Sequence, residues 1–290
     1  MVSFITSYMA GLHMKENLEA LAKTRFPFLM LFSSQGALFS MIQFVAFFGP
    51  LIGLILGFDS INRERAQGTL IKLVSQPIYR DAVINGKFLA GVVTISVLLV
   101  SVVLVISGFG LAIVGVVPEI EEIWRLLIYV LISIFYISFW LGISILFSIF
   151  FKGIATSALA SVALWIFLSF FISLGAEVAA NAIAPQGNKN QNEPELIIKN
   201  VRIKETISLS SPMVLYSKAT ETIINPMRKT TGSIIMMGPM EELLASRFKN
   251  PLSLGQSMIV VFPHITTLVA VTLICFAISY LVFMKQEIRT

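Results

Sequence analysis

Residues 88–117 read FLAGVVTISVLLVSVVLVISGFGLAIVGVV, an apolar run that holds no charged side chain. A helix that crosses a hydrocarbon core about 30 Å thick needs about 20 such residues. Only a helix can satisfy its own backbone polar groups in such a segment. The run therefore predicts a transmembrane helix, and a tilt or a break near Gly108 and Gly110 is expected to absorb its extra length.

Four further apolar stretches are long enough to cross a membrane. The five predicted spans are residues 37–58, 88–117, 126–151, 154–176 and 258–284. Pro50 lies inside the first span and can kink it, while Gly53 and Gly57 have the spacing that permits close helix packing, a pattern common by chance. Only Lys152 and Gly153 separate the third and fourth spans, which predicts an antiparallel hairpin. The predicted fold class is all-α, a polytopic helical membrane protein whose single transmembrane domain covers residues 1–290.

Composition supports a membrane protein over a soluble one. The chain is 56% hydrophobic and 13% charged, with a mean hydropathy of +0.86, whereas soluble domains carry about 25% charged residues. Its net charge of +5 comes mainly from connectors between apolar runs, so membrane orientation explains it and no nucleic-acid partner is expected. A single cysteine, Cys275, excludes a disulfide within the chain, and no pattern of metal ligands is seen.

The distribution of basic residues predicts the orientation. An odd number of spans places segment 59–87, the turn 152–153 and the C-terminus on one side, and these hold eight Lys or Arg residues. The positive-inside rule puts that side in the cytoplasm. Residues 177–257 are then a long external loop, in which short helices are expected to pack on the membrane face. Residues 26–32 are apolar but too short to span, which predicts a re-entrant or interfacial piece.

Segment 59–87 carries the most information about function. Gly68 is expected to separate the charged cluster that precedes it from a short amphipathic stretch, residues 69–74. Pro77 is expected to end that stretch. Arg80 and Asp81 then open a helix that continues into the second span. An ordinary surface helix that anchors the loop and a docking site for a partner remain equally good readings of these residues alone.

The same segment resembles the signature of type-2 permeases of ATP-binding-cassette (ABC) transporters. The shared pattern is E-R-x-x-G-T-L-x-x-L-x-S-x-P-x-x-R followed, after five residues, by G-K. The matching residues are Glu64, Arg65, Gly68, Thr69, Leu70, Leu73, Ser75, Pro77, Arg80, Gly86 and Lys87. Many fixed spacings agree at once, so the match is specific. Weaker similarities at 211–216 and 279–289 extend the resemblance over about residues 37–290.

The resemblance implies that 59–87 is a coupling segment, docked in a groove of a separate ATPase subunit. The residues expected at that contact are Glu64, Arg65, Gly68, Thr69, Leu70, Leu73, Pro77 and Arg80, with Arg80 and Lys87 holding the segment at the membrane surface. The partner ATPase would bind ATP and magnesium, so no cofactor is expected in this chain. Two copies, or one copy with a related permease, are expected to pair in the lipid bilayer of the cytoplasmic membrane. The family usually has six spans, so residues 1–36 are expected to correspond to the external region before its second span.

The absence of other motifs favours this interpretation. The sequence contains no G-x-x-x-x-G-K-[ST], H-E-x-x-H or G-x-S-x-G, so no ATPase site and no catalytic site of its own is predicted. The spans hold almost no ionisable side chains, whereas ion-coupled carriers place them inside the bilayer. The expected function is that of an exporter permease. The alternatives are a non-transporting or truncated membrane subunit and, less favoured, a secondary transporter or a membrane enzyme.

Overall fold

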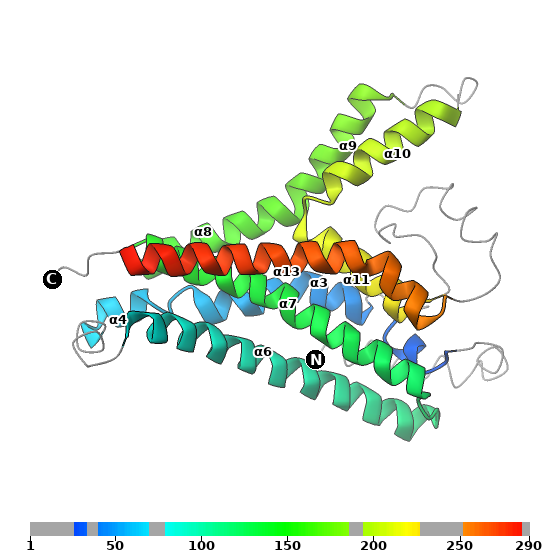
Figure 1. Cartoon of the computed structure of the whole chain (residues 1–290), viewed down its shortest axis with the longest axis horizontal. Helices are drawn as coiled ribbons and strands as arrows, with labels where there is room; N and C mark the ends of the chain where they lie inside the picture. The colour runs from blue at the N-terminus through cyan, green and yellow to red at the C-terminus, as the bar shows by residue number, and fades with distance from the viewer. Residues whose placement is uncertain (1–25, 34–39, 70–78, 186–193, 227–251, 286–290) are drawn as a thin grey trace.

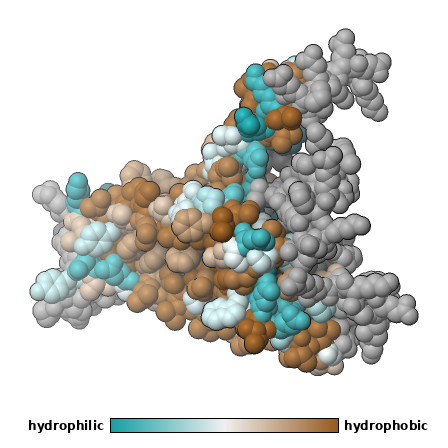
Figure 2. Space-filling view, turned by 45° about the vertical axis from the view of Figure 1, so that its right-hand side comes forward, coloured by the Kyte–Doolittle hydropathy of each residue, from teal (hydrophilic) through white to brown (hydrophobic). Residues whose placement is uncertain are grey.

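A computed structural model describes residues 26–33, 40–69, 79–185, 194–226 and 252–285. Within these ranges the chain forms helices and turns and no strand, as the all-α prediction requires. Five helices are long and apolar enough to cross a membrane, which confirms the predicted number. The surface of the bundle is largely apolar along its length, and hydrophilic side chains gather toward its ends (Figure 2).

The long helices are α3 (Met41–Gly57), α6 (Arg80–Phe109), α7 (Ile120–Phe150), α8 (Ile154–Ile166) with α9 (Ile172–Ile183), and α13 (Leu254–Lys285). A π-helical turn, η3 (Phe167–Phe171), joins α8 to α9, and another, η2 (Gly110–Val114), follows α6. The shorter helices are η1 (Leu29–Leu31), α4 (Asn62–Ala66), α10 (Pro194–Ser208) and α11 (Pro212–Ile224). Helix α7 is the centre of the bundle and packs along α3, α13, α6 and α11 (Figure 1).

Helices extend beyond several predicted spans because polar residues continue the helical backbone past the apolar run. Helix α6 begins at Arg80, as predicted for the helix that leads into the second span, and α7 begins at Ile120 rather than 126. The earlier start of α7 has a local cause, a capping box in which the side chains of Glu119 and Glu122 satisfy each other's backbone N–H groups. The expected break in the second span is present where α6 gives way to the π-helical turn η2. This turn ends at Val114 and is followed by Gly115, which has a φ of 72°.

Helices α3 and α7 approach each other closely along a row of glycines. A Cβ atom at Gly53 would lie 2.6 Å from the carbonyl oxygen of Ile137, and one at Gly57 would lie 2.7 Å from the Cβ of Ser144. The Ser144 hydroxyl donates a hydrogen bond to the Leu54 carbonyl at 2.8 Å. The glycine spacing, which the sequence leaves open to chance, therefore sets the distance between these two helices.

Helix α9 projects away from the bundle, and the chain returns into the bundle through α10 and α11 (Figure 1). Helices α9 and α10 form a hairpin that projects sideways, and α11 then lies between the long helices (Figure 1). The Tyr216 ring stacks on Tyr136 of α7 with centroids 4.3 Å apart, and its hydroxyl lies 2.9 Å from that of Ser133. Short helices are thus found as predicted, but the expectation that they pack on the membrane face is wrong for α11. Its apolar residues are covered by α7 and α13 instead.

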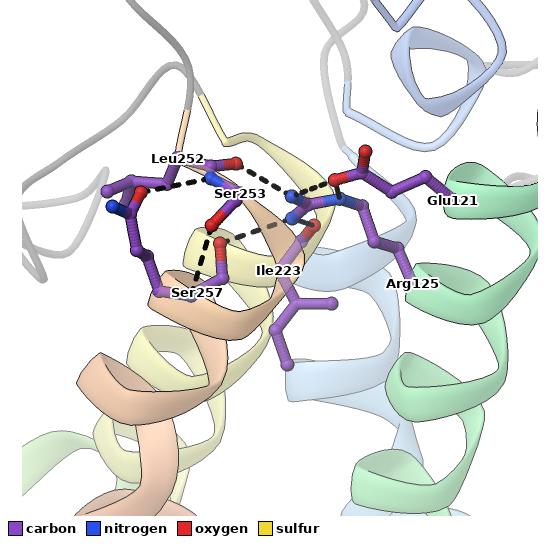
Figure 3. A network of polar contacts seen from close by, with 7 residues as sticks. Glu121, Arg125, Ile223, Leu252, Ser253 and Ser257 are labelled. Carbon is purple, nitrogen blue, oxygen red and sulfur yellow. Dashed lines mark hydrogen bonds and ion pairs between the residues drawn. The ribbon is translucent and has the colours of Figure 1, made fainter.

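One buried arginine connects three helices at the end of the bundle opposite α4 (Figure 3). The Arg125 guanidinium is fully buried and donates to the carbonyls of Ile223 at 3.0 Å and Leu252 at 2.8 Å. It also donates to the Ser257 hydroxyl at 3.2 Å and pairs with the Glu121 carboxylate at 2.8 Å. Arg125 therefore fixes the end of α11 and the start of α13 against α7.

The neighbouring Glu122 holds the apolar segment that precedes the first long helix. Its carboxylate accepts hydrogen bonds from the backbone N–H groups of Phe28 at 3.0 Å and Leu29 at 3.3 Å. Phe28 and Leu29 are each only 1% exposed. Residues 26–33 therefore contain a short, buried 3₁₀ turn, η1, that is hydrogen-bonded to the first turn of α7.

Candidate functional site

The segment singled out by the sequence lies at one end of the bundle, where three connections meet. These are the turn and short helix α4 after α3, the first turns of α6, and the turn between α7 and α8 (Figure 1). Ile61 is fully buried in this region, so an apolar side chain draws the start of α4 against the long helices. The described part of the site extends from the end of α3 to Thr69 and resumes at Tyr79.

Asn62 and Ser148 attach α4 to the end of α7. The Ser148 hydroxyl accepts hydrogen bonds from the backbone N–H groups of Ile61 at 3.0 Å and Asn62 at 3.1 Å. The Asn62 side-chain amide donates to the Gly153 carbonyl, in the α7–α8 turn, at 3.3 Å. Sequence reasoning missed both polar residues, because nothing in their spacing shows that they meet. Their contacts mean that a displacement of α4 acts directly on α7 and on the turn into α8.

Glu64 and Lys87 connect α4 to α6. The Lys87 ammonium donates to the Glu64 carboxylate at 2.6 Å, and both side chains are about three-quarters covered. The sequence predicts Glu64 at the contact with a partner and Lys87 as an anchor. The structure places Glu64 against Lys87, so this carboxylate holds the segment to the second long helix. This ion pair contributes weakly to moderately to stability, because both charged groups remain partly exposed to water.

The exposed edge of α4 is formed by other residues. The side chain of Arg63 is 67% exposed and lies 3.6 Å from the Asp59 carboxylate. Gln67, Gly68 and Thr69 follow it and are exposed as well. Gly68 has a φ of 68°, a left-handed conformation that favours glycine and ends the helix. Arg63 and Gln67, one turn apart, are therefore the outward-facing side chains nearest to the predicted contact residues.

The remaining predicted contact residues are only partly placed. The Thr69 hydroxyl donates to the Glu64 carbonyl at 3.2 Å, which closes the turn after α4. Arg65 is half-buried, and Arg80 is the first residue of α6. Leu70, Leu73 and Pro77 lie outside the described residues.

The described part of the site is a short helix attached to two long helices. Among the described residues no three His, Cys, Asp or Glu side chains gather in a way that could hold a metal ion. The site instead offers a short exposed helix with a left-handed turn, held from behind by hydrogen bonds to α7 and an ion pair to α6. Such a surface can bind a partner and pass its movement to the membrane helices.

Comparison with known proteins agrees with these features. The chain matches the family described as ABC-2 family transporter protein over residues 3–288. It is also 36% identical over 85 residues to the Probable ABC transporter permease protein NosY of Pseudomonas aeruginosa. That alignment covers 28% of this chain and 29% of the relative, so it spans less than a third of either protein. With its five candidate spans, the chain is a multi-pass membrane protein that belongs to the ABC-2 transporter family.

Proposed function

We propose that this chain is the permease subunit of an ABC exporter in the cytoplasmic membrane. A separate ATPase subunit docks on segment 59–87 and hydrolyses ATP in its own nucleotide-binding site. The proposed complex holds two permease chains, either two copies of this one or one copy with a related permease. The observation that carries the proposal is the attachment of α4, whose back is bonded to Ser148 and Gly153 while Arg63 and Gln67 face outward.

The proposed membrane orientation rests on which connections lie at the α4 end of the bundle. The end of the bundle with α4 and the α7–α8 turn also receives the C-terminal end of α13 (Figure 1). Because these regions carry eight basic residues in the sequence, that end is assigned to the cytoplasm. The Arg125 network lies at the opposite end, which is assigned to the external side. An ATPase that docks on α4 then has access to cytoplasmic ATP.

Coupling follows from the contacts behind α4. Closure of the docked ATPase subunits displaces α4, and Asn62 passes the displacement to the α7–α8 turn. The Glu64–Lys87 pair passes it to α6. Helices α6, α7 and α8 therefore move together when α4 is displaced. Direction of transport is assigned as outward from the family resemblance.

The test is co-purification of the tagged chain with the ATPase encoded beside it, in mild detergent. The variant Arg63→Glu with Gln67→Glu reverses the charge of the exposed edge without touching a buried contact. The matched control, Lys199→Glu with Val117→Glu, makes the same charge changes at exposed positions of the other end. We expect the ATPase to bind the wild type and the control but not the edge variant. Binding of the ATPase by all three chains would place the docking surface elsewhere.

A further inference from the structure

A cavity of about 330 Å³ lies between α7, α13 and the link from α10 to α11. Its floor is apolar and formed by the buried side chains of Phe139, Leu215 and Leu268. Its mouth carries three exposed hydroxyl residues, which are Thr206, Ser210 and Thr267. The volume is within the range of sites that bind small molecules. The lining suits a molecule with an apolar body and a polar end.

The cavity lies about midway along the length of helix α13. Leu268 is the fifteenth residue of α13, so it lies about 21 Å along the helix from Leu254. Lys285, at the other end of the helix, is about 26 Å further on. The hydrocarbon core is about 30 Å thick, so the cavity is at the level of the membrane interior.

A row of cations on α10 leads toward the mouth. Lys199, Arg202 and Thr206 are exposed and recur at positions i, i+3 and i+7, so they share one face of the helix. The Thr206 hydroxyl donates to the Arg202 carbonyl at 2.8 Å. Within the described part of the chain, neither cation of this row has an ion-pair partner, although Lys204 pairs with Glu177 and Lys218 with Glu205. Two exposed cations on one face of a helix attract an anion that approaches that face.

The start of α11 adds polarity at the same place. Pro212 lines the cavity and is the first residue of α11, in which only the N–H groups of Met213 and Val214 are left without a partner within the helix. The N-cap residue, Ser211, is fully buried, yet its hydroxyl makes no capping bond and has no partner among the described residues. The N-terminal end of a helix carries partial positive charge, which favours a negatively charged group nearby.

We propose that this cavity binds an amphipathic anion, with an apolar chain on the Phe139, Leu215 and Leu268 floor. The carboxylate or phosphate headgroup lies at the mouth, toward Arg202 and Lys199. We identify this class of molecule as the transported substrate. That identification rests on the proposed exporter function, whereas binding itself does not.

The binding test uses the full chain in nanodiscs of a zwitterionic lipid. A dansyl-labelled undecanoate serves as the fluorescent probe, and dodecanoate, dodecyl phosphate, dodecanol and dodecyltrimethylammonium compete with it. We expect both anions to displace the probe more strongly than the alcohol or the cation. The comparison of dodecanoate with dodecyl phosphate decides which headgroup is preferred.

Variants separate the cavity from the membrane around it. Thr267→Trp fills the mouth, while Thr266→Trp places the same bulk on an exposed neighbour that does not line the cavity. The first should weaken probe binding about tenfold, the loss expected when one or two methylene groups no longer fit. The second should bind as the wild type does. Val271→Phe fills the cavity from inside and repeats the test if Thr267→Trp does not fold.

Charge variants test the headgroup. Arg202→Gln should weaken dodecanoate by up to about fivefold, as for an exposed ion pair, and leave dodecanol unchanged. Equal binding by the two tryptophan variants, or equal displacement by the anions and the cation, overturns the proposal. If the ATPase co-purifies but the probe does not bind, the site is wrong and the transporter function stands. If the probe binds but no ATPase does, the transporter function fails and the site stands.

Discussion

Replacement of Arg125 by Met is the sharpest test of how the end of the bundle opposite α4 is held. Met keeps much of the length and the apolar packing but removes every donor. The Ile223 carbonyl then loses its partner in a buried position, and the Leu252 carbonyl loses its partner in a partly buried one. An unsatisfied buried acceptor costs about 1–3 kcal/mol, so the two together destabilise the local structure by about 3 kcal/mol. Glu121 contributes less to this loss because its side chain is 32% exposed and can be hydrated.

The effect should appear as local opening, measured by hydrogen exchange with mass spectrometry. A loss of about 3 kcal/mol corresponds to exchange about 100-fold faster in the amides of 219–224 and 254–260. Amides in the middle of α6, which has no bond to Arg125, should keep the wild-type rate. The control Glu121→Gln removes the charge of the partly exposed partner and should accelerate exchange by less than about fivefold. Equal acceleration by the two variants, or none with Arg125→Met, would refute the view that the buried carbonyls dominate.

Three further outcomes follow from the packing and the topology. Gly53→Ala should lower the free energy of unfolding by about 1–3 kcal/mol because the new methyl group meets the α7 backbone. Gly86→Ala, at a helical position with open space, should stabilise by up to about 1 kcal/mol, and thermal unfolding in detergent distinguishes the two. Asn62→Ala should speed hydrogen exchange of 61–66 about fivefold, since it deletes one hydrogen bond of about 1 kcal/mol; an unchanged rate would mean that this bond does not anchor α4. Single cysteines at Thr69 and Val117, without the native cysteine, should react with an impermeant maleimide from the cytoplasmic and the external side respectively, and the reverse pattern would invert the proposed orientation.

The coupling proposal and the substrate proposal share helix α7. Helix α7 carries Ser148 at the α4 end, Phe139 at the cavity and Arg125 at the other end. A movement received at α4 can therefore reach the cavity through one continuous, largely buried helix.

Much of the architecture is local in origin and could be predicted from the sequence. Apolar runs of 20 or more residues have few alternatives to a membrane-crossing helix, so the number of long helices follows from composition along the chain. The break after α6 was likewise predictable from Gly108 and Gly110, because glycine weakens a helix wherever it lies. The signature in 59–87 also pointed to the right family from residue identities and spacings alone.

The polar contacts that hold the bundle together depend on the tertiary structure. Ser148 meets Ile61 and Asn62 across 87 and 86 residues, and Arg125 reaches Leu252 across 127. Glu64 is predicted at the partner contact because its motif is shared, and only the tertiary structure brings Lys87 of the next long helix to 2.6 Å from its carboxylate.

The sequence by itself determined that this is a helical membrane protein of the ABC-2 family, because hydropathy and motif spacing are properties of the chain. Only the tertiary structure decided that α11 returns into the bundle, which side of α4 is exposed, and where a cavity forms. These depend on side chains far apart in sequence, whose mutual distances no local pattern specifies.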